Sequence, residues 1–176
     1  MHVGIWQSIP QPMISRYLAL MGWDWVILDM QHGSMGWETA YQCIHAVRQG
    51  GARPLVRTEI GSPTQVERAL DLGAGGVVVP MVKSVETARA LARAAKYPPL
   101  GERSLGGDNY LHYGADYFER ANEETLLLVQ MEHRDAVERA EEIMALPGVD
   151  GCFVGPVDLA LSLGLSRQRS EYERQP

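Results

Sequence analysis

The stretch PLVRTEIGSPTQVERALDLGAGGVVVP, residues 54–80, holds two apolar runs separated by a segment of helical character. The runs 54–58 and 76–80 are short and rich in aliphatic side chains, which is typical of buried strands. Ser62-Pro63 suits the start of a helix, and Gly73 suits the return from that helix to the next strand. The stretch therefore predicts a βαβ unit with parallel strands.

The same alternation runs through most of the chain. We expect strands at 3–7, 25–30, 54–58, 76–80, 126–132 and 151–155, followed by helical segments at 11–21, 36–49, 63–72, 84–95, 133–146 and from 157. This order predicts an α/β protein with a parallel sheet. The segment 97–118 is long, Gly-rich and aromatic, and we expect a functional loop or a subunit contact there.

The missing nucleotide motifs favour a barrel over a doubly wound sheet. Neither a Gly-x-Gly-x-x-Gly nor a P-loop motif follows any expected strand. A complete (β/α)8 barrel has eight strand–helix units and about 250 residues. Six units are visible in this sequence, so we expect a barrel domain over 1–165 with about six of its units, cut short before a polar tail at 166–176.

Composition excludes several classes of partner. The 176 residues carry a formal charge of −6, with Lys and Arg scattered along the chain, so we expect no binding to nucleic acid or to a membrane. Two cysteines suggest neither a disulfide framework nor a thiolate metal site. No segment resembles a leader or a bilayer span, and we expect a cytoplasmic protein.

Two carboxylates follow neighbouring strands. Glu132 and Asp158 come at the ends of the fifth and sixth expected strands. Because neighbouring strand ends converge in a parallel barrel, the pair could share a hard divalent cation. Each residue alone is better explained as an acid at the start of a helix, and Asp158 also as a helix cap, whereas the matched pair makes a metal site equally acceptable. Both interpretations stay open.

Three further polar residues end the second and third strands. His32 could be a general base oriented by Asp29, or a loop histidine that bonds to its neighbours. Arg57 could hold a carboxylate or an enolate oxygen with its fork of donors. Its alternative is a surface salt bridge with Glu59 or Glu67.

The turn Gly155-Pro156-Val157 offers the N–H groups of Gly155 and Val157 at a helix start, which suit an anionic carboxylate, although it could be merely a turn. No lysine stands at an apolar strand end, since Lys83 and Lys96 lie in or near helical segments. This placement disfavours chemistry through a Schiff base between a lysine and a carbonyl substrate.

Five motifs in register together resemble a known family: GWDWVILDMQHG, the segment from PLVRTEIGSP to VKSVETAR, YPPLGERS, LLLVQMEHRDAVE and GVDGCFVGPVDLALSLG. They are similar to the class II pyruvate aldolases of the HpcH/HpaI family, of 4-hydroxy-2-oxoheptanedioate aldolase type, from about Gly4 to Leu165. The resemblance implies a TIM barrel of the phosphoenolpyruvate/pyruvate superfamily. It also implies reversible cleavage of a 4-hydroxy-2-keto acid to pyruvate and an aldehyde, and a homo-oligomer.

The resemblance implies a role for each candidate residue. Glu132 and Asp158 would bind Mg²⁺ or Mn²⁺, with Co²⁺ or Zn²⁺ as alternatives. His32 would be the acid/base residue with Asp29 as its partner, and Arg57 would stabilise the keto or enolate oxygen.

The resemblance further implies that Gln130 lines the metal pocket and that the backbone of Gly155, Pro156 and Val157 receives the pyruvate carboxylate. Many relatives carry an acid where this chain has Gln31, so we expect less charge beside the histidine. A barrel without its last two units would also expose two sheet edges and an opened core.

Other hypotheses remain at this point. The chain could be a truncated, catalytically inactive family member that serves as an assembly partner. It could also be a related lyase that acts on an acyl-CoA, or a plain ligand-binding module. The aldolase predicts that pyruvate forms only when a divalent metal is present. The inactive partner predicts no Mn²⁺ binding together with association with a full-length paralogue, and the binding module predicts that Glu132→Ala leaves ligand affinity unchanged. The acyl-CoA lyase lacks an obvious basic site for a nucleotide phosphate.

Overall fold

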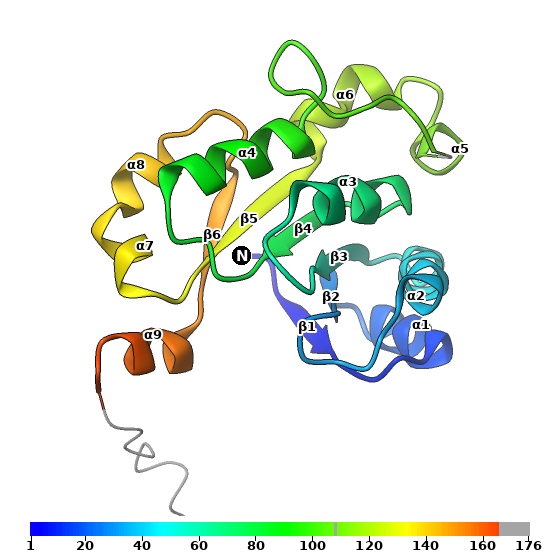
Figure 1. Cartoon of the computed structure of the whole chain (residues 1–176). Helices are drawn as coiled ribbons and strands as arrows, with labels where there is room; N and C mark the ends of the chain where they lie inside the picture. Colours follow the sequence, from blue (N-terminus) through cyan, green and yellow to red (C-terminus); the bar gives the residue numbers. More distant parts are fainter. Residues whose placement is uncertain (108, 166–176) are drawn as a thin grey trace, which may run out of the picture.

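The structure is a computed structural model that describes residues 1–107 and 109–165. The described residues form one curled sheet of six parallel strands in sequence order (Figure 1). The strands are β1 (Gly4–Gln7), β2 (Trp25–Asp29), β3 (Arg53–Arg57), β4 (Gly76–Val79), β5 (Leu126–Met131) and β6 (Gly151–Val154). The predicted α/β fold with six units of a barrel is thereby confirmed. The predicted tail at 166–176 lies outside the described residues.

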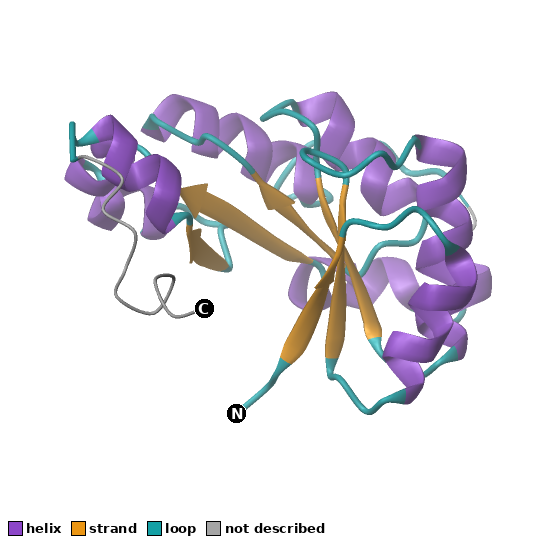
Figure 2. Cartoon of the chain, turned by 90° about the horizontal axis from the view of Figure 1, so that it is seen from below, coloured by secondary structure: helices purple, strands orange, loops and turns teal. Residues whose placement is uncertain are grey.

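Most of the helices lie along the outer, convex side of the sheet (Figure 2), whereas the last one follows the carboxyl end of β6 (Figure 1) and buries no residue. The helices are α1 (Pro12–Leu20), α2 (Trp37–Gln49), α3 (Pro63–Asp71), α4 (Val85–Ala95), α5 (Asn109–Tyr113), α6 (Tyr117–Glu124), α7 (Arg134–Glu138), α8 (Ala140–Met144) and α9 (Pro156–Ser162). Each strand is followed by at least one of them, as a parallel connection requires. None of these described helices is long and apolar enough to cross a membrane.

The structure differs from two predictions, one of a loop and one of a helix. The expected loop at 97–118 contains α5 and the start of α6, because Tyr117 and Ala121 lie one turn apart and both are buried. Arg120 also pairs with acids on either side of it along α6. The expected helix at 133–146 divides into α7 and α8 at Arg139, whose backbone leaves the helical region.

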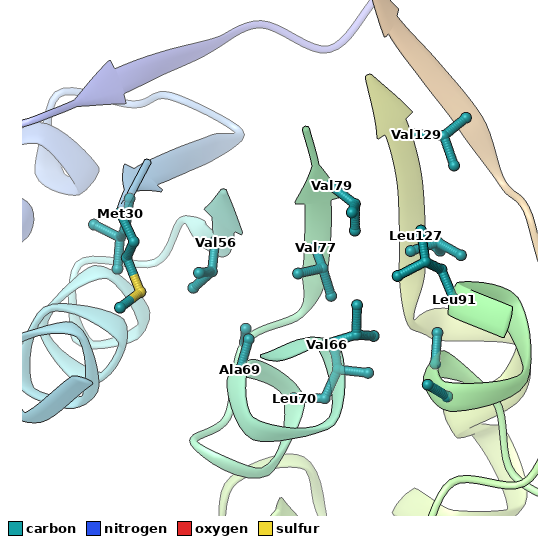
Figure 3. Packing of buried hydrophobic residues seen from close by; sticks show 14 of the residues in the cluster. Met30, Val56, Val66, Ala69, Leu70, Val77, Val79, Leu91, Leu127 and Val129 are labelled. Atoms are coloured by element: carbon teal, nitrogen blue, oxygen red, sulfur yellow. The ribbon is translucent and has the colours of Figure 1, made fainter. Parts of the chain in front are cut away.

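Alternation along the strands sorts side chains between the two faces of the sheet. The outward-facing residues, among them Val56, Val77 and Leu127, pack on the helices in the large core (Figure 3). The inward-facing residues include Leu55 and Val78, which form a second, smaller cluster. Because side chains alternate with a period of two, the polar residues two positions further along these inner rows also face inward.

The inner face is partly open. Trp6 of β1 and Phe153 of β6 contact each other there, with ring centroids 5.1 Å apart. An apolar cavity of about 520 Å³ lies against the same face and is lined by Leu55, Leu128 and Phe153, among others. Within the described part of the chain, β1 and β6 are the two edges of the sheet, as the expectation of two exposed edges requires.

Candidate active site

Four polar side chains reach the carboxyl edge of the sheet and are buried there. They are Asp29 at the end of β2, Arg57 at the end of β3, and Gln130 and Glu132 at the end of β5. Their exposed fractions are 2%, 8%, 3% and 1%, in that order. Buried polar groups need partners, so the contacts of these four define what the edge can do.

Asp29 and Arg57 form a closed ion pair. They are register partners on neighbouring strands. Arg57 donates from Nε to Oδ1 at 2.9 Å and from Nη2 to Oδ2 at 2.8 Å. Burial raises the pKa of Asp29, but the hydrogen bonds from Arg57, the His32 backbone and Trp6 outweigh it and lower the pKa to about 2. The carboxylate is therefore charged and holds the guanidinium in one orientation.

Trp6 also contacts Arg57 of this ion pair and was not identified from the sequence. The carbon at the centre of the Arg57 guanidinium lies 4.6 Å from the centroid of the Trp6 ring, within the range of a cation–π contact. The candidate residues are polar and stand at strand ends, whereas Trp6 is aromatic and lies inside β1. Its inward position in the alternation of β1 is the signal that could have found it.

The geometry of His32 corrects one expectation. Asp29 accepts a hydrogen bond from the backbone N–H of His32 at 3.3 Å, and another from that of Gln31 at 3.1 Å. It does not orient the imidazole as we expected, because its two oxygens are bound by Arg57 and by this loop backbone. The His32 side chain is exposed at the rim. Asp29 thus holds the loop that carries the histidine.

The partners of Arg57 also exclude the surface salt bridge with Glu59 or Glu67. The Arg57 side chain is 10% exposed and its ion pair is with Asp29. The Arg57 guanidinium has five N–H bonds, of which Asp29 takes two. Further donors therefore remain for an oxygen atom at the carboxyl edge.

Glu132 is held by its own strand and by the loop after β4 rather than by the helix that follows it. Its Oε1 accepts from the backbone N–H of Met81 at 2.7 Å, and its Oε2 from Nε2 of Gln130 at 2.6 Å. The interpretation of Glu132 as an acid at a helix start is therefore wrong, because the cap of α7 is His133. The described contacts of Glu132 include no cation.

Gly155 closes the space beside this carboxylate. A Cβ atom at position 155 would lie 2.6 Å from Oε2 of Glu132 and 3.1 Å from Nε2 of Gln130. Only glycine allows the end of β6 to approach both groups so closely. The N–H of Gly155 already donates to the carbonyl oxygen of Met131 at 3.2 Å, and Pro156 has no N–H. Of this turn, the N–H of Val157 is the donor left to consider.

Asp158 is exposed, unlike the buried group. It lies in the first turn of α9, so its interpretation as an acid at a helix start is confirmed, whereas its interpretation as the cap is wrong because the cap is Gly155. Within the described ranges 1–107 and 109–165, no three or more His, Cys, Asp and Glu side chains are grouped to hold a metal ion.

Three buried amide oxygens near this edge have no hydrogen-bond partner among the described residues: the Oε1 atoms of Gln7, Gln31 and Gln130. Gln130 touches Glu132 through its nitrogen, so its oxygen is an available acceptor within the same group. Buried acceptors without partners are uncommon and point to a missing ligand or water. The edge is therefore built for a group that supplies positive charge or N–H and O–H donors.

Comparison with known proteins agrees with this picture. The chain matches the family model described as HpcH/HpaI aldolase/citrate lyase over residues 2–175. A hydroxypyruvate/pyruvate aldolase of Rhizorhabdus wittichii is 38% identical over 160 residues, which cover 90% of this chain and 64% of that protein. A 2-keto-3-deoxy-L-rhamnonate aldolase of Klebsiella pneumoniae is 34% identical over 166 residues, which cover 92% of this chain and 62% of that protein.

Among solved structures, that of the citrate synthase SbnG superposes with a TM-score of 0.86 at 33% identity. The match covers 97% of this chain and 68% of that one. The chain thus spans slightly less than two thirds of the length of both aldolases, at 64% and 62%.

Proposed function

Because the chain belongs to the HpcH/HpaI aldolase/citrate lyase family, we propose that it acts as a metal-dependent aldolase. The reaction is the reversible cleavage of a 4-hydroxy-2-keto acid to pyruvate and an aldehyde. Two relatives are named for aldolases, one of them a hydroxypyruvate/pyruvate aldolase, which supports this reaction class. The observation that carries the proposal is the buried Glu132 carboxylate, which faces neutral donors on the same edge as Arg57.

The residues at this edge fit a hard divalent cation. Each oxygen of Glu132 accepts one hydrogen bond and keeps a lone pair. The Oε1 atom of Gln130, which has no hydrogen-bond partner among the described residues, is a further possible metal ligand. Carboxylate and amide oxygens are the ligands that Mg²⁺ and Mn²⁺ prefer. We propose that Glu132 and Asp158 hold the cation, with Gln130 lining its pocket. The bound cation would supply positive charge at the keto oxygen of the substrate.

Arg57 would stabilise the same oxygen from the protein side. Breaking the bond between the third and fourth carbons leaves an electron pair on the pyruvate enolate, so negative charge develops at the keto oxygen. Arg57 is held in place by Asp29 and Trp6 before any substrate binds, and it retains N–H donors. A donor fixed in advance needs no reorganisation when the charge develops.

His32 would take the proton from the 4-hydroxyl group. The imidazole is exposed at the rim, on the loop that Asp29 fastens through two backbone N–H groups. A neutral imidazole is a suitable general base near neutral pH. The N–H of Val157, in the first turn of α9, would receive the carboxylate of pyruvate.

Metal depletion and one substitution test the proposal. We expect the chain with Mn²⁺ or Mg²⁺ to release pyruvate from a 4-hydroxy-2-keto acid in a coupled dehydrogenase assay, and EDTA to abolish the release. We expect Glu132→Gln to lower the rate by roughly 10²–10³-fold. Glu59→Gln, at an exposed glutamate just after β3, is the matched control and should keep the wild-type rate. Release that survives EDTA and metal depletion contradicts the proposal.

The same proposal extends to the setting of the enzyme. A cytoplasmic location fits the two free cysteines, Cys43 and Cys152. A homo-oligomer fits the apolar stripe on α1, where Met13, Tyr17 and Leu20 are about 60% exposed. Analytical ultracentrifugation tests the second point, and a monomer at micromolar concentration contradicts it.

A further inference from the structure

Met81 adopts a backbone conformation that its side chain does not explain. Its φ is +53°, and it is the one non-glycine residue with positive φ in the ranges 1–107 and 109–165. Left-handed backbone is sparsely populated by residues that carry a Cβ atom, and glycine is its usual occupant. The Met81 side chain is 40% exposed, so core packing is not what holds this conformation.

The conformation places the backbone N–H of Met81 against the buried carboxylate. Met81 follows Pro80 at the end of β4, and its N–H donates to Oε1 of Glu132 at 2.7 Å. Residues in rare backbone regions persist where the surroundings hold them, and such residues cluster at functional sites. The short hydrogen bond from this N–H to a buried carboxyl oxygen is a contact of this kind.

The second oxygen of Glu132 is held from the other side. Gln130 donates from Nε2 to Oε2 at 2.6 Å, and Gly155 approaches the same oxygen closely enough to exclude a Cβ atom. The hydrogen bonds from Met81 and Gln130 therefore hold one carboxyl oxygen each and fix the plane of the carboxyl group. The lone pairs that remain are therefore held in a set orientation, as the ligands of a tight cation site must be.

We propose that Met81 is a positioning residue, whose left-handed backbone aims its N–H at Glu132 and orients that carboxylate for the divalent cation. The inference rests on the proposed function, because it assigns Glu132 to the cation. Met81 contributes through its backbone N–H, so its role cannot be recognised from the chemistry of its side chain.

A backbone ester at position 81 tests the inference, because an α-hydroxy acid in place of methionine removes this N–H and keeps the side chain. We expect the ester to weaken Mn²⁺ binding by about tenfold, measured as free Mn²⁺ by electron paramagnetic resonance. The matched control is the same ester at the exposed Lys83, two residues along the loop, which should bind Mn²⁺ like the wild type. Glu132→Gln should abolish the binding.

The outcomes separate this inference from the proposed function. If the ester at 81 binds Mn²⁺ as tightly as the wild type while Glu132→Gln does not bind, the role of Met81 is wrong and the metal site stands. If the ester at Lys83 weakens binding equally, the contact is not specific and the inference falls. If the wild type binds no Mn²⁺, the proposed metal site itself is wrong.

A second measurement applies even if the ester at 81 fails to fold. Selective ¹⁵N labelling of the eight methionines gives a simple amide spectrum of the wild-type chain. We expect the Met81 amide proton to resonate downfield, to move on addition of Mg²⁺, and to move upfield in Glu132→Gln. A Met81 resonance that is unchanged in Glu132→Gln overturns the inference.

Discussion

The amino and carboxyl ends of the strands, called here the amino edge and the carboxyl edge, bury charged groups in opposite ways. At the amino edge, Lys96 is 1% exposed, and its ammonium donates to the carbonyl oxygens of Asn122 at 3.0 Å and Thr125 at 2.6 Å. It also donates to Oδ2 of Asp150 at 2.9 Å, and this oxygen accepts from the backbone N–H of Leu127. The three N–H bonds of the ammonium therefore meet three acceptors, and the network is closed.

At the carboxyl edge the group around Glu132 is not closed. The described partners of Glu132 are neutral N–H donors, and Oε1 of Gln130 has no partner in the described part of the chain. A buried network that is fully satisfied makes a structure rigid, whereas one with unmet groups costs free energy. The difference fits our proposal that the carboxyl edge keeps its unmet groups for a ligand, while the closed network at the amino edge serves stability.

Lys96→Met is the change with the largest expected effect, because it breaks the closed network. The substitution leaves Asp150 without its cation and removes the donor from two carbonyl oxygens, a buried one at Thr125 and a partly buried one at Asn122. We expect the free energy of unfolding to fall by about 3 kcal/mol, since a broken buried ion pair leaves uncompensated polar groups. Urea denaturation followed by circular dichroism measures it.

Lys83→Met is the matched control for this prediction. Lys83 is exposed in the loop after β4, so the same substitution should change the free energy of unfolding by less than about 0.5 kcal/mol. Equal effects of the two substitutions would show that the Lys96 network adds no more to the free energy of unfolding than an exposed lysine does. The amino edge would then not be the stabilising edge of the sheet.

The ion pair of Asp29 and Arg57 is the closed part of the carboxyl edge, and pH tests it. The folded-state pKa of Asp29 is about 2, below the ordinary value of 3.8. The pair's contribution is therefore present above about pH 4 and is lost as the pH falls through about 2. The shift of nearly two units corresponds to about 2 kcal/mol of unfolding free energy.

Arg57→Met isolates this contribution. Without the guanidinium, the hydrogen bonds from the His32 backbone and Trp6 are all that still oppose burial, so the pKa of Asp29 rises, and we expect the loss of stability between pH 4 and pH 2 to shrink by up to about 2 kcal/mol. Urea denaturation at pH 5, 4, 3 and 2 measures the two profiles. Parallel profiles of the wild type and the variant would mean that other carboxylates cause the acid sensitivity.

The contrast also explains what could be predicted from the sequence. Apolar runs bounded by turn residues place strands well, and the expected strand at 25–30 is β2 at Trp25–Asp29. The period of two then brings Asp29, Arg57 and Glu132 to one edge. These are local signals, which a single sequence carries in full.

The partners of these residues depend on contacts distant in sequence. Lys96 meets Asp150 across 54 residues, and Met81 meets Glu132 across 51. Neither contact leaves a pattern in the neighbouring residues. For the same reason the partner of Asp29 was predicted to be the nearby His32, whereas the structure gives it Arg57, 28 residues away. Local spacing predicts which edge a side chain reaches, and the fold decides what it meets there.

Glu132→Gln has the smallest expected effect on stability, and it is the sharpest test of the contrast. The neutral side chain can still accept from the N–H of Met81 through its own oxygen, and its new NH₂ group can donate to Oε1 of Gln130 after that amide turns over. The substitution replaces a buried carboxyl group whose described partners include no cation, so we expect the metal-free free energy of unfolding to change by less than about 1 kcal/mol. Urea denaturation in EDTA measures it against Lys96→Met. A loss as large as that of Lys96→Met would mean that Glu132 belongs to a closed structural network, and the carboxyl edge would then hold no group in reserve for a ligand.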